Sequence, residues 1–537
     1  MAQPLLSIGM IVKNEIRCLE KCLKALQPLR DAIPCELVIA DTGSDDGTRE
    51  VAAQYADTLF DFTWVNDFSA ARNAVLDRCT GRWFLAVDAD EYLDPDFKPL
   101  TDFLTGPEEE QYTLALVNQY SYRDIKMEGA GADFLALRMA RMDTHPRYSG
   151  SIHESLPVRP NDRAKILLDV KLHHDGYAID PKHPELHTRK MERNLVLLEN
   201  ELKKSPNELR RLLQSIESSG PFPARQVEYV RRAMKALTQK NDPRLEKIYG
   251  PIICDHALRV AVDQKMPELD KWQQWAMKKY PDNIFLRVDG NFTMVRYYRD
   301  QKQYDKVPEF AKAYLLGWRD FQDRNFDVSI LAHSIMSCTS RKFEVYARAG
   351  GGEALGRMGK TAEAAELLAG EPDWEELSRA EVYTFLGGCA WAAEEPALQT
   401  FVASGAEVVR TKNAAGWEGF LSAAEAAFKP HEPNEDAPDR PWRLYARVEG
   451  SLGRAAAMME AEDAASVQEL VSAITEWKEV PAPAVARVIE LGVELPENFY
   501  AQNREQLQTL AVRLCELVQP QVVLDWTSRF DFSATMA

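Results

Sequence analysis

Short apolar runs alternate with amphipathic stretches throughout the first hundred residues. Strands separated by helices in this way are typical of βαβ crossovers, which join the strands into a parallel sheet. We therefore predict an open α/β domain that binds its ligand at the carboxyl edge of the sheet. The predicted strands are Leu5–Val12, Glu36–Ala40, Thr58–Trp64 and Trp83–Val87, and the predicted helices are Ile16–Leu29, Thr48–Tyr55 and Ser69–Cys79.

The pattern changes twice along the rest of the chain. Longer extended runs at Thr113–Tyr120, Phe134–Met142 and Lys165–Leu172 predict further strands that complete the same domain as a mixed sheet. Beyond about residue 180, apolar residues recur at three- and four-residue spacing, which predicts helices. We therefore predict an α/β domain over residues 1–180, helical repeats over 181–430 and a C-terminal helical unit over 431–537.

Two segments within the helical region have the length of a tetratricopeptide (TPR) unit. Asp282–Leu315 reads as a helix, a polar turn and a second helix, and Tyr346–Leu368 repeats this arrangement. Stacked helix pairs of this kind bind extended polypeptides or associate with each other, so a homodimer through the repeats is one expectation. Three successive glycines, Gly350–Gly352, predict a break between helices.

Charge and hydropathy exclude several classes of protein. The formal net charge of −18 argues against a nucleic-acid-binding protein. No uninterrupted apolar run approaches the roughly 18 residues of a transmembrane helix, and the first residues carry no basic leader segment. The eight cysteines are scattered without metal-binding spacing, which favours reduced thiols. We expect a cytoplasmic protein.

Closely spaced carboxylates follow the fourth predicted strand. Asp88 and Asp90 come directly after the apolar run Phe84–Val87, at the sheet edge where open α/β domains bind ligands. Two such carboxylates can hold one divalent cation, which in turn can hold a diphosphate. For an isolated Asp-x-Asp motif a solvated acidic turn is the simpler reading, so the neighbouring segments decide between the two.

Three other segments supply polar groups near the same edge. Residues 12–15, VKNE, end the first strand, and residues 40–48, ADTGSDDGT, follow the second with a turn that reads alone as a helix cap. Asp41 in this turn could accept hydrogen bonds from a base or a ribose. Residues 67–73, DFSAARN, place Arg72 at the start of the third helix, where a surface ion pair is the alternative.

The order and spacing of these segments with VDADEYLD at 87–94 resemble the family 2 glycosyltransferases, which have the GT-A fold. The resemblance covers about residues 5–180. It implies that Arg72 lies near the phosphates of a nucleotide-sugar donor and that Asp88 and Asp90 hold a metal on the diphosphate. The residues that it implies for the nucleoside pocket are Ile11, Asn14, Glu15 and Asp41.

Two histidine-containing segments extend the resemblance. Residues 150–154, GSIHE, and 174–177, HDGY, are similar to segments of bacterial family 2 members that carry a helical repeat tail, although each alone reads as a polar loop. His174 is then a candidate ligand for the diphosphate or for a metal such as Mn²⁺, which neutral imidazole suits. Glu154 is the first candidate for the base that takes the acceptor proton, and Asp175 is the second.

These inferences predict a glycosyltransferase that uses Mn²⁺ or Mg²⁺ and inverts the configuration of the transferred sugar. A UDP-sugar is the expected donor, and the acceptor is a polypeptide or a cell-envelope glycan. A second reading is a catalytically weak scaffold that binds a sugar nucleotide and acts through its helical repeats. Nucleotidyl transfer is disfavoured, because the segment after the first strand lacks the glycine-rich basic signature of those enzymes.

Overall fold

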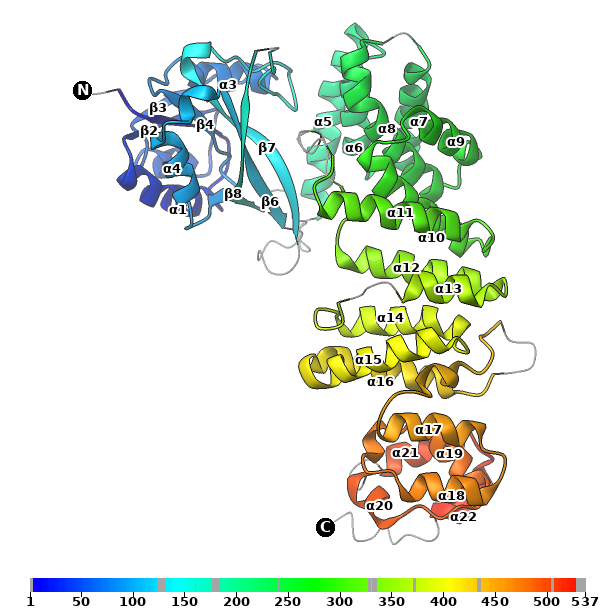
Figure 1. The fold of residues 1–537 in the computed structure, drawn as a ribbon. Coiled ribbons are helices and arrows are strands. Elements are labelled where there is room, and N and C mark those ends of the chain that lie inside the picture. The colour runs from blue at the N-terminus through cyan, green and yellow to red at the C-terminus, as the bar shows by residue number, and fades with distance from the viewer. Residues whose placement is uncertain are drawn as a thin grey trace. The chain divides into compact units, whose positions relative to one another are not determined.

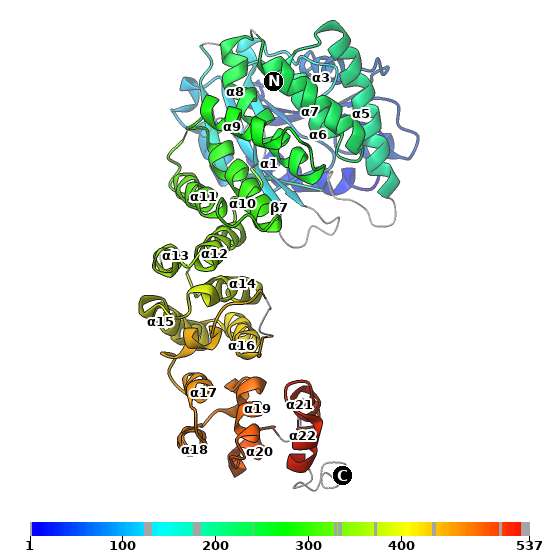
Figure 2. The same cartoon turned by 90° about the vertical axis from the view of Figure 1, so that its right-hand side faces the viewer.

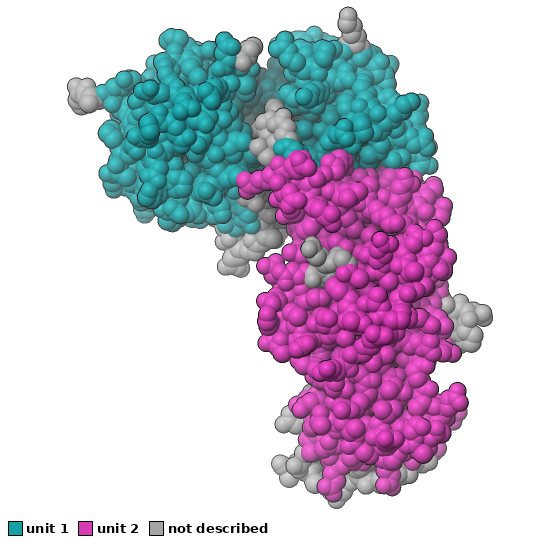
Figure 3. All heavy atoms as spheres, in the orientation of Figure 1, with its two compact units in different colours: residues 1–286, 326–337 teal, residues 287–325, 338–537 magenta. Residues whose placement is uncertain are grey.

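The computed structural model of the chain contains two compact units, one of residues 1–286 with 326–337 and one of 287–325 with 338–537 (Figure 3). The predicted borders at residues 180 and 430 do not coincide with this division and stay predictions. The structure describes residues 3–122, 131–159, 161–175, 184–239, 241–326, 330, 336–369, 373–431, 436–503 and 507–527.

Eight strands form one sheet in the first unit, in the order β3-β2-β1-β4-β7-β6-β8-β5 (Figure 1). Strands β3, β2, β1 and β4 are parallel, whereas β7 runs antiparallel to both β4 and β6. The predicted α/β domain with a mixed sheet is therefore confirmed. The strands are β1 (Leu6–Val12), β2 (Cys35–Asp41), β3 (Thr58–Asp61), β4 (Trp83–Ala86), β5 (Glu91–Leu93), β6 (Leu114–Tyr122), β7 (Gly131–Arg141) and β8 (Ala164–His174).

Alternate residues of the parallel strands enter two different cores. In β4, Trp83 and Leu85 join the core that α1 (Leu19–Ala32) and α4 (Lys98–Thr105) cover. Phe84 and Ala86 join the core on the other face, where α3 (Phe68–Leu76) packs. Because both faces are covered, these strands are mainly apolar, as expected of buried parallel strands. Between β2 and β3 lies the short helix α2 (Thr48–Ala52).

One strand was not predicted. The sequence predicts no strand directly after Asp90, but Glu91–Leu93 form β5, which pairs antiparallel with β8. The three residues are buried, so Tyr92 and Leu93 belong to the core and Glu91 is an enclosed carboxylate. A three-residue strand has too few residues to show a period in the sequence.

Five α-helices follow the sheet along the described residues of the first unit. Figure 2 views the molecule from the side of these helices, which lie in front of the sheet. They pack against one another in sequence, as the three- and four-residue spacing predicts. They are α5 (Pro184–Lys204), α6 (Leu209–Ser218), α7 (Pro223–Leu237), α8 (Pro243–Asp263) and α9 (Leu269–Lys279).

The second unit is helical throughout its described residues. Both predicted helical pairs are present, and one core runs from Val345 to Trp526. Within the described part of the chain, no helix is both long and apolar enough to cross a bilayer. The α-helices are α10 (Asn291–Asp300), α11 (Val307–Gln322), α12 (Arg341–Arg357), α13 (Thr361–Leu368), α14 (Arg379–Cys389), α15 (Pro396–Lys412), α16 (Ala414–Phe428), α17 (Ser451–Glu460), α18 (Ala464–Ser472), α19 (Ala482–Glu490), α20 (Glu497–Asn503), α21 (Leu507–Cys515) and α22 (Pro520–Thr527).

The predicted helix break at Gly350–Gly352 is wrong, because these residues lie inside α12. A Cβ atom on Gly351 would come within 2.9 Å of the Ala311 Cβ atom, and one on Gly352 would lie 2.5 Å from Leu368. The glycines thus allow α11 and α13 to approach α12 closely, and this packing offsets their low helix propensity.

Candidate active site

The predicted residues of the first two strands lie at the carboxyl edge of the parallel strands. Asp41 is the last residue of β2, and Asn14 follows β1 with a left-handed backbone (φ 55°). The Asp41 Oδ1 atom accepts hydrogen bonds from the backbone N–H groups of Gly43 (3.1 Å) and Ser44 (2.9 Å). The Asn14 side chain accepts one from the Asp45 N–H group at 2.9 Å. The two loops are therefore linked, and Asp41 stabilises its own turn.

Glu15 and Ile11 flank this edge. Ile11 is half-buried in β1 and packs against the core under α3. The Glu15 backbone N–H group donates to the Thr48 hydroxyl at 2.7 Å, which ties it to α2. Burial, together with the nearby Asp90, raises the pKa of Glu15 to about 7.

Asp88 lies between two arginines. Its Oδ1 atom accepts from Arg72 at 2.7 Å, and its Oδ2 atom lies 3.3 Å from the Arg138 guanidinium. Burial opposes ionisation of Asp88, but the two guanidinium groups outweigh it and hold the pKa well below its ordinary value. Both carboxylate oxygens therefore have partners already, which distinguishes Asp88 from Asp90.

Asp90 faces His174 across the site. The Asp90 Oδ2 atom lies 3.6 Å from His174 Nε2, and the Ser121 hydroxyl lies 3.2 Å from His174 Nδ1. Burial works against the charged forms of both groups, but their mutual contact outweighs it, so the pKa of Asp90 is lowered and that of His174 raised. This pair is brought together from the end of β4 and the end of β8.

Whether these residues can hold a divalent cation depends on the ligand atoms that they offer. Among the described residues, no cluster of three or more His, Cys, Asp or Glu side chains is arranged to hold a metal. Asp90 and His174 supply two ligands, and a polar partner on Nδ1 is the usual way to orient a ligating imidazole. Mg²⁺ commonly binds through one or two carboxylates together with waters and substrate phosphates, so this pair fits a cation that arrives with a diphosphate.

Glu154, the first candidate base, lies next to Arg72, one of the two arginines that bind Asp88. Its Oε1 atom accepts from Arg72 Nε at 2.5 Å, so Arg72 bridges Glu154 and Asp88. Arg72 is buried between these carboxylates, whereas the resemblance places it near donor phosphates. The two placements are compatible only if a phosphate contacts the same guanidinium.

Asp175, the second candidate base, has a different environment. Its two oxygens accept from Arg17 at 2.9 and 3.0 Å, and the Tyr92 hydroxyl donates to it at 3.0 Å. This buried carboxylate links the turn before α1 to β5, and both of its oxygens have partners. The remainder of its predicted motif, Gly176 and Tyr177, lies outside the described residues.

Two further residues of the site, Arg138 and Glu91, were not predicted from the sequence. Arg138 of β7 forms an ion pair with Glu91, and its Nη2 atom also lies 3.2 Å from Gln119 Oε1. Burial raises the pKa of Glu91 to about 7, although Arg138 opposes this shift. A charged residue inside the apolar run Phe134–Ala140 is a signal that could have identified Arg138, because strands rarely bury an unpaired arginine.

Carboxylates outnumber guanidinium groups in this cluster, and their excess of negative charge grows as the pH rises through about 7, where Glu15 and Glu91 ionise. A negatively charged site of this kind favours a bound cation. The carboxylates are Glu15, Asp88, Asp90, Glu91 and Glu154, and the guanidinium groups are Arg72 and Arg138.

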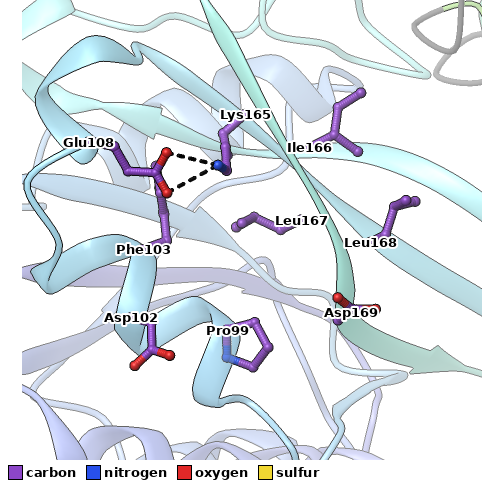
Figure 4. A pocket seen from close by; sticks show the side chains of 9 residues that line it. All are labelled: Pro99, Asp102, Phe103, Glu108, Lys165, Ile166, Leu167, Leu168 and Asp169. Carbon is purple, nitrogen blue, oxygen red and sulfur yellow. Dashed lines mark hydrogen bonds and ion pairs between the residues drawn. The ribbon is translucent and has the colours of Figure 1, made fainter.

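A separate pocket of about 340 Å³ lies between α4 and the first half of β8 (Figure 4). Its lining includes Asp102, Glu108, Lys165 and Asp169, and Glu108 and Lys165 form an ion pair across it. None of the predicted site residues lines this pocket, which adjoins the beginning of β8 rather than its end.

The N-terminal residues are similar to known proteins. Residues 7–151 match the model of the family described as glycosyl transferase family 2. The SPbeta prophage-derived glycosyltransferase SunS of Bacillus subtilis is 26% identical over 219 residues, 38% of this chain and 46% of SunS. A lipopolysaccharide core biosynthesis glycosyltransferase of Rhizobium meliloti, LpsC, is 29% identical over 109 residues, 20% of this chain and 38% of the relative. The predicted family resemblance is thus confirmed for this domain.

Another relative is a repeat-containing protein. A TPR repeat-containing protein of Synechococcus elongatus is 42% identical over 87 residues, 16% of this chain and 21% of the relative. The chain spans less than half the length of each of these three curated relatives. Among solved structures, Staphylococcus aureus TarS aligns over 49% of this chain and 55% of its own, with 13% identity and a TM-score of 0.29. A likeness of that TM-score supports no conclusion about this chain.

Proposed function

We propose that this chain is an inverting, metal-dependent glycosyltransferase that moves a sugar from a nucleoside-diphosphate donor, first of all a UDP-sugar, to a polypeptide or cell-envelope glycan. The observation that carries the proposal is the convergence of Asp88, Asp90, His174 and Glu154 at one edge of the sheet, within a domain that matches the family 2 model.

Asp90 and His174 are the residues that would hold the cation, and the Ser121 hydroxyl would keep the imidazole oriented. A bound Mn²⁺ or Mg²⁺ ion supplies a Lewis acid that stabilises the charge on the departing diphosphate. In this proposal Asp88 stays paired with Arg72 and Arg138, and it fixes the loop that carries Asp90 rather than binding the metal directly.

Glu154 is the proposed base. The nucleophilic atom of the acceptor forms a bond to the anomeric carbon while the bond from that carbon to the diphosphate oxygen breaks on the opposite face. The acceptor proton passes to the Glu154 carboxylate, and the electron pair of the broken bond stays on the nucleoside diphosphate. We favour Glu154 over Asp175, because both Asp175 oxygens are held by Arg17.

Nucleoside diphosphate release tests this proposal. The full-length protein is incubated with Mn²⁺ and a panel of nucleotide sugars, and released diphosphate is measured for wild type, Asp90→Ala and Asp169→Ala. Asp169 is the matched control, an exposed carboxylate on the pocket beside α4. We expect one donor to be turned over, D90A to abolish release and D169A to preserve it; equal release from D90A and wild type would refute the metal assignment.

The scaffold reading has one observation in its favour, since Asp88 and Glu154 are both engaged in ion pairs with Arg72. A scaffold would bind a donor without turnover, so calorimetric binding with no diphosphate release in the presence of acceptor extracts would favour it. A cytoplasmic location and a homodimer through the helices stay predictions, and gel filtration with light scattering would test the second.

A further inference from the structure

The segment that carries Glu154 is a closed loop. Ser149 and Ser155 exchange backbone hydrogen bonds of 3.1 and 3.2 Å, which join the two ends of the loop. Inside it, Gly150 (φ 103°) and His153 (φ 47°) have left-handed backbones. For a residue other than glycine this conformation costs on the order of 1 kcal/mol or more, so it persists only where the surroundings hold it in place.

Two helices hold this loop from different sides. From the beginning of α3, the Ser69 hydroxyl donates to the Gly150 carbonyl at 2.6 Å, and the Phe68 N–H group donates to the Ser151 carbonyl at 3.0 Å. The next two carbonyls are bound by α6. Arg211 Nη1 donates to the Ile152 carbonyl at 3.0 Å.

Arg210 completes this arrangement. Its Nη2 atom donates to the His153 carbonyl at 2.7 Å, directly before Glu154. Four successive carbonyls, from Gly150 to His153, therefore each accept a hydrogen bond from a helix. Backbone carbonyls in the middle of a loop usually accept hydrogen bonds from water. Four successive carbonyls that accept from protein groups therefore show that the two helices hold this loop in place.

Neither arginine is explained by a close carboxylate partner. The shortest distances from the Arg211 guanidinium to carboxylates are 3.6 Å to Glu201 and 3.9 Å to Glu208. Among the described residues, Arg210 forms no ion pair, and burial lowers its pKa. A buried guanidinium is costly to desolvate, and the carbonyl contacts offset this cost, together with a hydrogen bond from Arg211 to Gln214 Oε1 at 2.9 Å.

We propose that Arg210 and Arg211 are positioning residues, which hold the backbone before Glu154 so that its carboxylate faces the site. Arg72 of α3 then fixes the carboxylate end at 2.5 Å. The inference rests on the proposed function, because it acts through Glu154. It makes α6, the second helix after the sheet, part of the catalytic site. A displacement of about 1 Å in such a group can cost roughly a hundredfold in rate.

A double-mutant cycle tests the role. Release of nucleoside diphosphate is measured in full-length wild type, R211M, E154Q and R211M/E154Q, with R210M in parallel. We expect R211M to lower kcat by roughly 10- to 100-fold with donor KM within twofold, and to cause no further loss in the E154Q background. Multiplied losses in the double variant, or a wild-type kcat in R211M, would overturn the proposal.

R159M is the matched control. Arg159 also donates to two backbone carbonyls, those of Thr144 (2.7 Å) and His145 (3.2 Å), but in a loop that does not carry Glu154. The kcat of R159M should stay near the wild-type value. R211K retains a donor that can reach a carbonyl and should recover part of the kcat, which separates positioning from loss of the fold.

Hydrogen exchange distinguishes failure of this inference from failure of the proposed function. In R211M, amides 149–155 should exchange faster than in wild type, whereas those of β1 should not change. If these amides exchange at the same rate in R211M as in wild type, α6 does not hold the loop, whatever the activity of the variant. If wild type releases no diphosphate from any donor, the proposed function fails, and the catalytic role of the two arginines fails with it.

Discussion

Arg138 reaches from β7 to two carboxylates that follow β4, Asp88 and the fully buried Glu91. Arg138→Met would leave Glu91 without its guanidinium, and breaking a buried ion pair costs about 3–5 kcal/mol. We expect the free energy of unfolding in urea to fall by that amount and E91Q to restore part of it. Arg141→Met is the control, because its partner Asp143 is exposed and such pairs contribute about 1 kcal/mol or less. Equal losses in R138M and R141M would contradict the prediction.

His153 gives the loop next to Glu154 a dependence on pH. Burial lowers the pKa of His153 below its ordinary value of 6.5, although Glu217 and Glu154 oppose the shift. The unfolded chain then binds the proton more readily, so this contribution to stability is present above about pH 6.5 and is lost as the pH falls toward the lower pKa of the folded state.

His153→Asn should remove this pH dependence, since asparagine tolerates a left-handed backbone. The measurement is the free energy of unfolding in urea between pH 5 and 8. His145→Asn is the matched control, because His145 has a similar backbone (φ 51°) but is exposed. If H153N and wild type lose the same stability on acidification, His153 does not carry the effect.

Replacing a glycine by alanine should change the free energy of unfolding in opposite directions in two neighbouring helices, α12 and α14. Gly352→Ala in α12 places a Cβ atom 2.5 Å from Leu368, so we expect a loss of about 1–3 kcal/mol from overpacking. Gly387→Ala in α14 meets nothing within 4 Å and is exposed, so it should gain about 0.5–1 kcal/mol from helix propensity. Chemical unfolding of both variants checks the signs, and a gain in G352A would show that α13 can move away from α12.

At the scale of the whole molecule, the core over residues 345–526 shares no residue with the two cores that flank the sheet. Phe420 of α16 is fully buried in the core of the second unit, so Phe420→Ala should cost about 3–5 kcal/mol there. Calorimetry should show a lowered transition for that unit, while donor turnover at 20 °C stays at the wild-type value. Turnover that falls in proportion to the lost stability would mean that the second unit supports the site directly.

The sequence predicted much of the fold because its signals are local. The period of apolar residues identified the parallel strands, the mixed sheet and the helical region, and the motifs located most polar groups of the sheet edge. The predictions failed where a local pattern was absent or misleading. Glu91–Leu93 form a strand too short to show a period, and Gly350–Gly352 remain helical because neighbouring helices need their missing side chains.

Local sequence sets which residue types stand at the carboxyl edge of the sheet, since strand ends and turns depend on neighbouring residues. Which of these groups meet depends on how the chain folds in three dimensions. Arg72 pairs with Glu154, 82 residues away, and Arg17 pairs with Asp175 across 158 residues. The choice follows from the strand order and from α6 packing on the loop, because a charge in a buried site pairs with whatever opposite charge the chain topology brings near it.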